Sequence, residues 1–374
     1  MLRVALCTDG VHPFALGGMQ RHSRLLAEHL ARTGAVELTV LHPHPIGLFD
    51  PSLGIREVQV PDIDRNRFYL RELWRYSDRM GKQLEALAPD VILSQGFSVW
   101  KGIDRFSDKL IVNPHGLEMF QGLTWKDRLV GLPFRKALRY ILRRSAVAVS
   151  LGGKLTDILR DQVKGSSCEV HVLPNAVEVG DKGVQVPAIS GPLQLLFVGR
   201  FAVNKGLDVL MTVARRLAAA HPELAHVQLA GDGPLLKEIQ AQGLPPNVTV
   251  LGRVDDAQLA RLYRECDALV LPTRFEGMPT VVLEAMAQGK PILVSDVGAT
   301  AELVTPHNGY LLPPGDAEAL YNAVQAFAER PAEVRRKMGA YGRQRVIERF
   351  SWPVVAEAHV RLCRQVAERA SAKR

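Results

Sequence analysis

The chain is organised around the stretch Thr273-Arg-Phe-Glu-Gly-Met-Pro-Thr-Val-Val-Leu-Glu-Ala-Met-Ala-Gln-Gly289, which joins a turn to a helix start and holds two carboxylates. Every residue from 281 to 287 is apolar except Glu284, so this segment is predicted to be a helix that is buried on nearly all sides. A buried charge without a partner is costly, so Glu284 is expected to face a polar cavity or a ligand hydroxyl.

The turn before this helix is a candidate anion site. It contains Glu276, eight positions before Glu284. Backbone groups at a helix N-terminus and the helix dipole favour an anion, so a phosphate is expected between the two carboxylates. The residues at that position are Gly277, Met278, Pro279 and Thr280. A buried helix with one satisfied and one solvated glutamate would explain the same pattern, and only the rest of the chain decides between the two.

The bulk composition limits the class of protein. A length of 374 residues favours two domains, and 47% hydrophobic with 23% charged residues is typical of a folded soluble chain. The apolar runs are far shorter than the roughly 18 residues that span a bilayer, and the N-terminus resembles a strand more than a signal peptide. The four cysteines are widely spaced, which argues against a zinc site or a disulfide framework and suits a reducing cytoplasm.

The first half of the chain alternates strands and helices. A strand at 2–8, a loop, a helix from about 19 to 33 and a strand at 36–42 form a βαβ unit. Further strands are predicted at 91–94, 110–112, 147–150 and 170–173, so this half is predicted to be a doubly wound α/β domain. Gly17 and Gly18 precede the first helix and would let the backbone approach a ligand, although turns use glycine for many reasons. The fingerprints of dinucleotide-binding and P-loop proteins are absent.

Two further patterns in this half concern ligands. His115 follows a strand, at the end where open parallel sheets bind ligands, although a capping or core role fits the position equally well. The segment Asp62-Ile-Asp64 matches a D-x-D metal motif, but its surroundings indicate a surface turn, so no metal site is predicted.

The stretch 125–144 is basic and amphipathic, with seven basic residues and one acidic residue interleaved with apolar ones. It is predicted either to lie on an anionic membrane surface or to pack its apolar face on the sheet, and the sequence does not decide between these. The net charge of +8 also raises nucleic acid as a partner. That partner is disfavoured, because aromatic residues do not alternate with basic ones along any strand-like face.

The second half repeats the strand and helix alternation after a linker at 174–192. Strands are predicted at 193–198, 227–231, 248–252 and 268–271. Arg200 and Lys205 lie in the loop after the first of these strands, near a helix start, where together they would neutralise a diphosphate. Gly231 and the pair Arg253-Val254 follow the next two strands.

The motifs in these loops and their order along the chain resemble those of the retaining glycosyltransferases of family 4, which have the GT-B fold. The resemblance extends over nearly the whole length of the chain. The matching motifs are Gly17-Gly18, the His115 loop, Pro174-Asn175, Gly199 to Gly206, Gly231 to Pro234, Glu276 to Glu284 and Phe350-Ser-Trp352. The resemblance implies two Rossmann-like doubly wound domains that face a cleft. Residues 1–185 with 352–374 would bind the acceptor and 186–351 the nucleotide sugar, with the C-terminal helix crossing back to the first domain.

The resemblance also implies a role for each site residue. Arg200 and Lys205 would stabilise the departing pyrophosphate, Glu276 would bind the transferred sugar and His115 would reach that sugar from the opposite domain. Glu284 would accept the ribose hydroxyls, and the backbone near Arg253-Val254 would bind the base. The other residues implied to bind substrate are Gly17, Gly18, Asn175, Gly231, Gly277, Met278, Pro279 and Thr280. No metal and no other cofactor is expected.

The implied function is transfer of a hexose from a nucleotide-diphosphate sugar, with UDP favoured over GDP, to a glycan or lipid-linked acceptor. The expected setting is cell-envelope or polysaccharide synthesis, such as that of lipopolysaccharide, in the cytoplasm or on the inner face of the cytoplasmic membrane. A GT-B sugar-nucleotide epimerase, which would release free sugar, remains an alternative. A non-catalytic membrane-associated binding protein is a further one, but it would not need Arg200, Lys205, Glu276 and Glu284 together.

Overall fold

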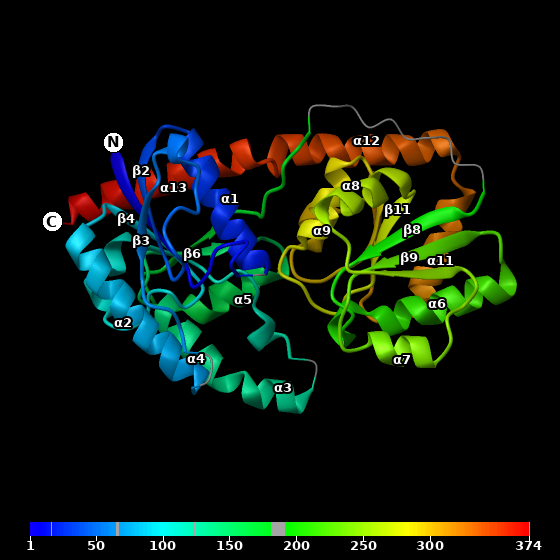
Figure 1. Cartoon of the computed structure of the whole chain (residues 1–374), viewed down its shortest axis with the longest axis horizontal. Coiled ribbons are helices and arrows are strands. Elements are labelled where there is room, and N and C mark those ends of the chain that lie inside the picture. The colour runs from blue at the N-terminus through cyan, green and yellow to red at the C-terminus, as the bar shows by residue number, and fades with distance from the viewer. Residues whose placement is uncertain (16, 65–66, 123, 181–190, 374) are drawn as a thin grey trace. The chain divides into compact units, whose positions relative to one another are not determined.

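The computed structural model describes residues 1–15, 17–64, 67–122, 124–180 and 191–373 (Figure 1). The chain divides into two compact units. Unit 1 comprises Met1–Ala176 and Trp352–Arg374, so the C-terminal segment joins the N-terminal part, and unit 2 comprises Val177–Ser351. The predicted domain boundary between residues 185 and 186 lies outside the described residues.

Unit 1 is built on a seven-stranded parallel sheet with the order β3-β2-β1-β4-β5-β6-β7. Its strands are β1 (Leu2–Cys7), β2 (Val36–His42), β3 (Arg56–Gln59), β4 (Val91–Gln95), β5 (Leu110–Asn113), β6 (Val147–Ser150) and β7 (Glu169–Val172). Its helices are α1 (Gly18–Arg32), α2 (Tyr69–Leu87), α3 (Trp125–Val130), α4 (Leu132–Leu142), α5 (Lys154–Val163) and α13 (Trp352–Ala372). Short 3₁₀ helices are η1 (Pro51–Leu53), η2 (Ile103–Arg105), η3 (Ser107–Lys109) and η4 (Glu118–Phe120).

Unit 2 is built on a six-stranded parallel sheet with the order β10-β9-β8-β11-β12-β13. Its strands are β8 (Leu193–Val198), β9 (Ala225–Ala230), β10 (Val248–Gly252), β11 (Ala268–Leu271), β12 (Ile292–Ser295) and β13 (Gly309–Leu312). Its helices are η5 (Val203–Lys205), α6 (Leu207–Ala220), α7 (Leu236–Ala241), α8 (Asp256–Glu265), α9 (Thr280–Ala287), α10 (Thr300–Leu303), α11 (Ala317–Glu329) and α12 (Ala332–Arg349).

Helices cover both faces of each sheet, as the apolar sequences of the central strands predict. All residues of β4, β5, β6, β11 and β12 are buried, because central parallel strands have helices against both faces. The C-terminal helix α13 packs against α1 and completes the core of unit 1 with Trp352, Val355 and Val360. The predicted α/β architecture with two Rossmann-like units is therefore confirmed.

The strand orders locate the edge where ligands are expected. In unit 1 the chain builds outward from β1 in one direction and from β4 in the other, and in unit 2 it does so from β8 and β11. The loops that leave two such neighbouring strands diverge to opposite faces of the sheet. The resulting switch point, at the carboxyl ends of the strands, is where open α/β sheets bind ligands.

Candidate active site

The loops after β8 and β11 meet at the switch point of unit 2. The Nζ atom of Lys205, at the end of η5, donates to the Oε1 atom of Glu276 in the loop after β11. The side chains of Lys205 and Glu276 are only 23% and 11% exposed. The hydroxyl of Thr273 donates to the same carboxylate oxygen at 3.2 Å. The structure thus joins a cation and a carboxylate that the sequence placed on separate loops.

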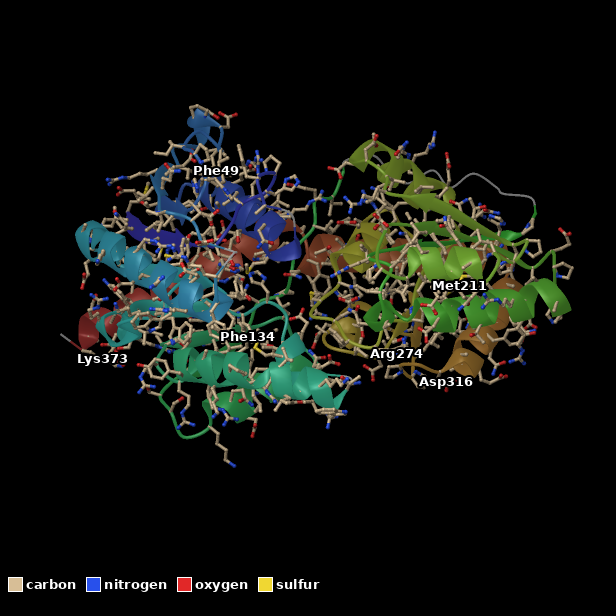
Figure 2. The ribbon with its side chains drawn as sticks, turned by 60° about the horizontal axis from the view of Figure 1, so that its bottom comes forward. Phe49, Phe134, Met211, Arg274, Asp316 and Lys373 are labelled. Carbon is tan, nitrogen blue, oxygen red and sulfur yellow. The ribbon has the colours of Figure 1, made fainter. Side chains whose placement is uncertain are left out.

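Arg274, labelled in Figure 2, fastens these two loops together. Its guanidinium donates to both carboxylate oxygens of Asp208, at 2.7 and 2.6 Å, and to the carbonyl oxygen of Val203 at 2.6 Å. Its backbone N–H donates to the carbonyl oxygen of Asn204. The hydrogen bonds between the side chains lower the pKa of Asp208 and raise that of Arg274, so both groups stay charged at neutral pH. The segment just before Lys205 is therefore held in place.

Two glycines let the loops pack backbone against backbone. At Gly206 (φ 67°) a Cβ atom would lie 1.8 Å from the carbonyl oxygen of Pro272. At Gly231 (φ 143°) it would lie 1.9 Å from the carbonyl oxygen of Gly199. No side chain fits either position without a shift of the backbone. Gly231, predicted to bind substrate, therefore has a packing role that does not depend on a ligand.

The two remaining candidate cations of unit 2, Arg200 and Arg253, differ in their partners. Arg200 is exposed, and its side chain forms no hydrogen bond or ion pair with the described part of the chain. The side chain of Arg253 is 81% exposed and lies 3.2 Å from the carboxylate of Asp232, with the partly exposed Val254 next to it in the chain. In the free protein, Arg200 is therefore the cation of these loops that is ready for an anion.

The second carboxylate, Glu284, is partly buried on α9. Its Oε2 atom accepts a hydrogen bond from the hydroxyl of Tyr263, on α8, at 2.9 Å. The expected polar partner is thus a tyrosine in the free protein, and no sequence pattern had singled Tyr263 out. Of the residues predicted to bind an anion, Gly277 and Met278 precede α9, Pro279 is its N-cap and Thr280 is its first residue.

In unit 1 the candidate residue His115 follows β5 in a conformation that residues other than glycine seldom adopt (φ 59°). Its backbone N–H donates to the side chain of Asn113 at 2.9 Å, and its Nε2 atom donates to the Oε1 atom of Gln95 at 2.6 Å. Burial lowers the pKa of His115 to about 3, so the imidazole is neutral at physiological pH. Asn175, predicted to bind substrate, is buried in the same unit.

His115 lies beside a cluster of buried rings that sequence reasoning missed. The ring of His22, on α1, lies edge-on 5.0 Å from that of His115, and the indole of Trp352 lies 5.4 Å from His22. The ring of His29 stacks on the same indole at 5.3 Å. Burial lowers the pKa of His359 to about 4 and that of His22 well below its usual value. The Phe350-Ser-Trp352 motif contains the indole of this cluster, but the sequence did not connect it with the histidines.

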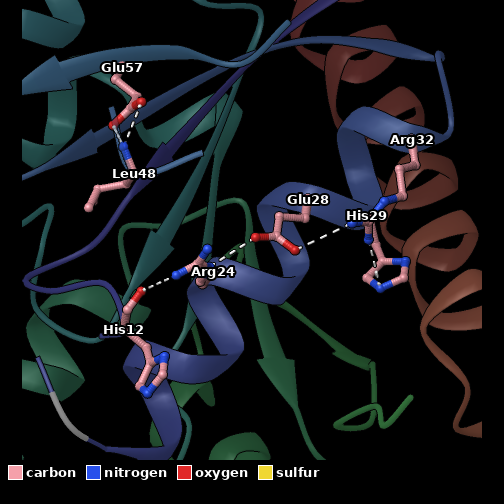
Figure 3. Close-up of polar contacts among 7 residues, drawn as sticks. All are labelled: His12, Arg24, Glu28, His29, Arg32, Leu48 and Glu57. Carbon is pink, nitrogen blue, oxygen red and sulfur yellow. Dashed lines mark hydrogen bonds and ion pairs between the residues drawn. The ribbon is translucent and has the colours of Figure 1, made fainter. Parts of the chain in front are cut away.

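Gly17 and Gly18 are exposed at the start of α1, with Gly17 as the N-cap and Gly18 as the first helical residue. Figure 3 shows how the preceding loop is tied to this helix. Arg24 donates to the carbonyl oxygen of His12 at 3.1 Å and pairs with Glu28 at 2.9 Å. The glycines therefore stand on an anchored turn beside β1, at the switch point of unit 1.

The basic stretch 125–144 is two helices separated by Gly131, because Pro133, in the first turn of α4, has no N–H to continue the hydrogen bonds of α3. Helix α4 buries Ala137, Leu138, Ile141 and Leu142, so the packed-helix alternative is correct for this part. Helix α3 has no buried residue, and its apolar side chains Trp125, Leu129 and Val130 are 70%, 58% and 70% exposed.

Within the described residues, no group of three His, Cys, Asp or Glu side chains could hold a metal ion. Over the same residues, no helix has the length and apolar character needed to cross a bilayer. The D-x-D segment is a surface feature, since Asp64 pairs with Arg67 at 2.9 Å and Asp62 is exposed. All four cysteines are buried free thiols.

Two family models match successive parts of the chain. The model for glycosyltransferase family 4 matches residues 16–181, and the model for glycosyl transferases group 1 matches residues 183–345. Together they cover both units. The loop that contains Lys205 and the Glu276 to Glu284 segment fall in the second match, and His115 falls in the first.

Known proteins of the same kind align with most of the chain. A glycogen synthase of Mycobacterium tuberculosis is 24% identical over 96% of this chain and 93% of its own length. A phosphatidyl-myo-inositol mannosyltransferase of Mycobacterium leprae is 30% identical over 67% of this chain and 64% of its own length.

Solved structures share the fold. The sucrose-phosphate synthase of Thermosynechococcus elongatus has a TM-score of 0.81 at 24% identity, with 98% of this chain and 99% of that chain covered. Anabaena HepE in complex with UDP-glucose has a TM-score of 0.67 at 17% identity, with both chains covered in full. The two family matches, the relatives and the GT-B neighbours agree, and the chain therefore belongs to glycosyltransferase family 4.

Proposed function

We propose that this glycosyltransferase moves a sugar from UDP to a glycan or lipid-linked acceptor, with retention of the anomeric configuration, in cell-envelope or polysaccharide synthesis. The observation that carries the proposal is the Lys205–Glu276 ion pair at the switch point of unit 2, with the exposed Arg200 in the same loop. A structural neighbour solved in complex with UDP-glucose supports the donor class, and relatives named as mannosyltransferase and glycogen synthase support sugar transfer.

Arg200 and Lys205 would stabilise the leaving diphosphate. Its negative charge grows as the bond to the anomeric carbon breaks, so the two cations interact more strongly with the transition state than with the bound donor. One such contact is typically worth about 3–4 kcal/mol. In the free protein Glu276 already neutralises Lys205, so the lysine is held near its working position without a buried unpaired charge. When the donor binds, Glu276 would accept from hydroxyls of the transferred sugar.

The nucleoside would be held by neighbouring groups of unit 2. Glu284, kept in place by the hydroxyl of Tyr263, would accept from the ribose hydroxyls. The backbone beside Arg253 and Val254, at the end of β10, would bind the base. These contacts concern parts of the donor that do not change during the reaction, so they contribute to binding more than to the chemical step.

His115 would contact the transferred sugar as a neutral group. Since its Nε2–H is engaged by Gln95, the Nδ1 atom remains as an acceptor for a sugar hydroxyl. We assign retention to front-face attack: the acceptor hydroxyl attacks the anomeric carbon from the same face that the leaving group departs from. A phosphate oxygen of the leaving group takes the proton of that hydroxyl. No metal is needed in this scheme, because Arg200 and Lys205 supply the positive charge.

A screen of donors tests the proposal. Thermal shifts with UDP-, GDP- and ADP-sugars identify the base, and mass spectrometry with NMR of the anomeric proton identifies the product and its configuration. We expect UDP-sugars to stabilise the protein, the product to be a retained glycoside, and EDTA to leave the rate unchanged. Free sugar as the sole product would instead indicate a GT-B epimerase. Loss of activity in EDTA that Mn²⁺ restores would refute metal independence.

We further propose that α3 associates with the anionic inner face of the cytoplasmic membrane. Trp125, Leu129 and Val130 are exposed beside the cations Lys126 and Arg128, and each basic residue near such a surface adds about 1 kcal/mol. A reducing cytoplasm agrees with the four free thiols.

Co-sedimentation with vesicles should rise with anionic lipid and fall with salt, and Trp125→Ser with Leu129→Ser should abolish it. Val172→Ser, at another exposed apolar residue of unit 1, is the matched control. Equal pelleting with neutral vesicles would contradict the association.

A further inference from the structure

We propose that unit 1 carries a second binding pocket, for a phosphate group attached to an apolar chain. It rests on the proposed function, because it names the acceptor class as a lipid phosphate or diphosphate. The pocket has a volume of about 380 Å³. Its walls come from η4, α4 and α5: Phe120, Leu132, Arg135, Lys136, Arg139 and Gln162.

The charge around this pocket is not balanced by the protein. Arg135, Lys136 and Arg139 line it together, and none of them pairs with a carboxylate in the part of the chain that the structure describes. Arg135 and Arg139 are four residues apart on α4, so they lie on one face and repel each other. A bound anion would attract both guanidinium groups and so offset this repulsion.

The hydrogen bonds of the same side chains leave room for such an anion. Arg139 donates from Nε to the Oε1 atom of Gln162 at 2.8 Å, and Arg135 donates from Nη2 to the carbonyl oxygen of Arg128. The Nε–H of Arg135 is buried and has no hydrogen-bond partner among the described residues. A phosphate offers several acceptor oxygens and matches guanidinium geometry, so it would satisfy this donor and the remaining N–H groups.

The apolar side of the pocket indicates that the phosphate is not free. Phe120 and Leu132 line the same pocket as the cations, and the side chain of Leu132 is exposed. Helix α3 contacts both η4 and α4, and it exposes Trp125 and Leu129. An apolar chain that leaves the pocket therefore has a surface to follow, whereas inorganic phosphate would use the cations alone.

The test is direct binding of dodecyl phosphate below its micelle concentration, by calorimetry at roughly physiological salt, where diffuse attraction is screened. Inorganic phosphate, an uncharged dodecyl detergent and short-chain phosphatidylglycerol are the comparison ligands. We expect dodecyl phosphate to bind most tightly, since its monoester carries more charge than the phosphodiester of phosphatidylglycerol.

Variants of the pocket sharpen the test. Arg135→Gln and Arg139→Gln should each weaken dodecyl phosphate about ten-fold, the size expected for one charged hydrogen bond. Arg143→Gln removes the same charge just after α4 but outside the pocket, and should leave binding within about two-fold. Leu132→Ser should weaken dodecyl phosphate and leave inorganic phosphate unchanged.

Four results would overturn the proposal. They are the absence of binding, equal loss in Arg143→Gln, inorganic phosphate or the uncharged detergent binding as tightly as dodecyl phosphate, and tighter binding of phosphatidylglycerol. The same protein is titrated with UDP. If UDP and UDP-sugars do not bind while dodecyl phosphate does, the proposed function fails and the pocket stands. If UDP binds while dodecyl phosphate does not, the pocket fails alone.

Discussion

The two units share one architecture but treat charge in opposite ways at their switch points. In unit 2 the candidate residues are ion pairs, Lys205 with Glu276 and Arg274 with Asp208. In unit 1 the candidate residue is His115, whose imidazole, like that of His359 on α13, has a lowered pKa and is neutral. A diphosphate needs fixed positive charge, whereas hydroxyl groups need neutral donors and acceptors. Under the proposed function, the same fold would supply two kinds of site, one from the loops of unit 2 and one from His115 beside helices α1 and α13 of unit 1.

The largest expected effect comes from breaking the ion pair in unit 2. Lys205→Met should lower kcat by about 10²–10³ and change the Kd of the intact UDP-sugar donor only a few-fold, because the charge that the lysine meets grows during departure. Glu276→Gln should also lower kcat more than it weakens binding. Since the two side chains contact each other, the double variant should lose less than the sum of both changes.

Kinetics with calorimetry of UDP-sugar binding separate these effects. Lys237→Met, an exposed lysine of α7, is the matched control and should be as active as the wild type. If the affinity for the intact UDP-sugar falls as far as kcat/KM while kcat is unchanged, Lys205 only binds the donor.

The neutral imidazoles of unit 1 predict a stability that depends on pH. In the folded protein the pKa is about 3 for His115 and about 4 for His359, against 6.5 for an ordinary histidine. At a pH between the folded and the unfolded pKa of each histidine, the unfolded chain binds a proton that the folded chain does not. The stabilisation is therefore complete above about pH 6.5 and is lost as the pH falls toward 4, by about 2 kcal/mol per histidine at pH 5.

Urea unfolding at pH 7.5, 6 and 5 measures this loss. Replacing His359 by Gln removes one of the buried imidazoles and should make the slope shallower by about one proton. An unchanged slope in this variant would show that His359 is not the group that titrates.

A smaller effect is expected at Glu284. Glu284→Gln should raise the donor KM about ten-fold and leave kcat nearly unchanged, because the ribose does not change during the reaction. A 2′-deoxyribose donor provides the check. It should be penalised in the wild type and much less in Glu284→Gln. Equal penalties in both proteins would place the ribose elsewhere.

Much of the fold followed from local patterns. The predicted strands at 36–42, 193–198 and 268–271 have the bounds predicted for them, because apolar runs with flanking turn residues mark buried parallel strands. The strands β3, β12 and β13 were not predicted. They are four residues long each, and β3 lies at an edge of its sheet with partly exposed residues, so its hydrophobic pattern is weak.

The site was predictable as a set of loops but not as a set of contacts. Strand ends indicated Arg200, Lys205, Glu276 and His115, because ligands bind at that edge of the sheet. The Lys205–Glu276 pair and the Tyr263–Glu284 bond join residues 71 and 21 positions apart, and no local periodicity encodes such pairs. The buried His22 and His359 looked like ordinary members of amphipathic helices. The role of His359 in the prediction of pH-dependent stability comes from the structure.

The smallest expected effect concerns the pair of Arg274 and Asp208, which positions the segment before Lys205. The Asp208 side chain is 56% exposed, so solvent screens the pair and its own contribution to stability should be at most about 1 kcal/mol. Arg274→Lys keeps the charge but removes the second of the two parallel hydrogen bonds to the carboxylate of Asp208. We expect kcat to fall about three- to ten-fold with the KM for donor unchanged, since Lys205 would be less well placed rather than lost.

Asp208→Asn separates positioning from charge. It keeps the shape of the side chain, and it should cause the same moderate loss as Arg274→Lys, with no further loss when the two are combined. Arg215→Lys, on the same helix α6 but bonded to Gln242, is the control and should have wild-type kcat. If Arg274→Lys reduced kcat as severely as Lys205→Met, Arg274 would itself be a cation of the diphosphate site. The contrast between a binding loop and the residues that fasten it would then no longer hold.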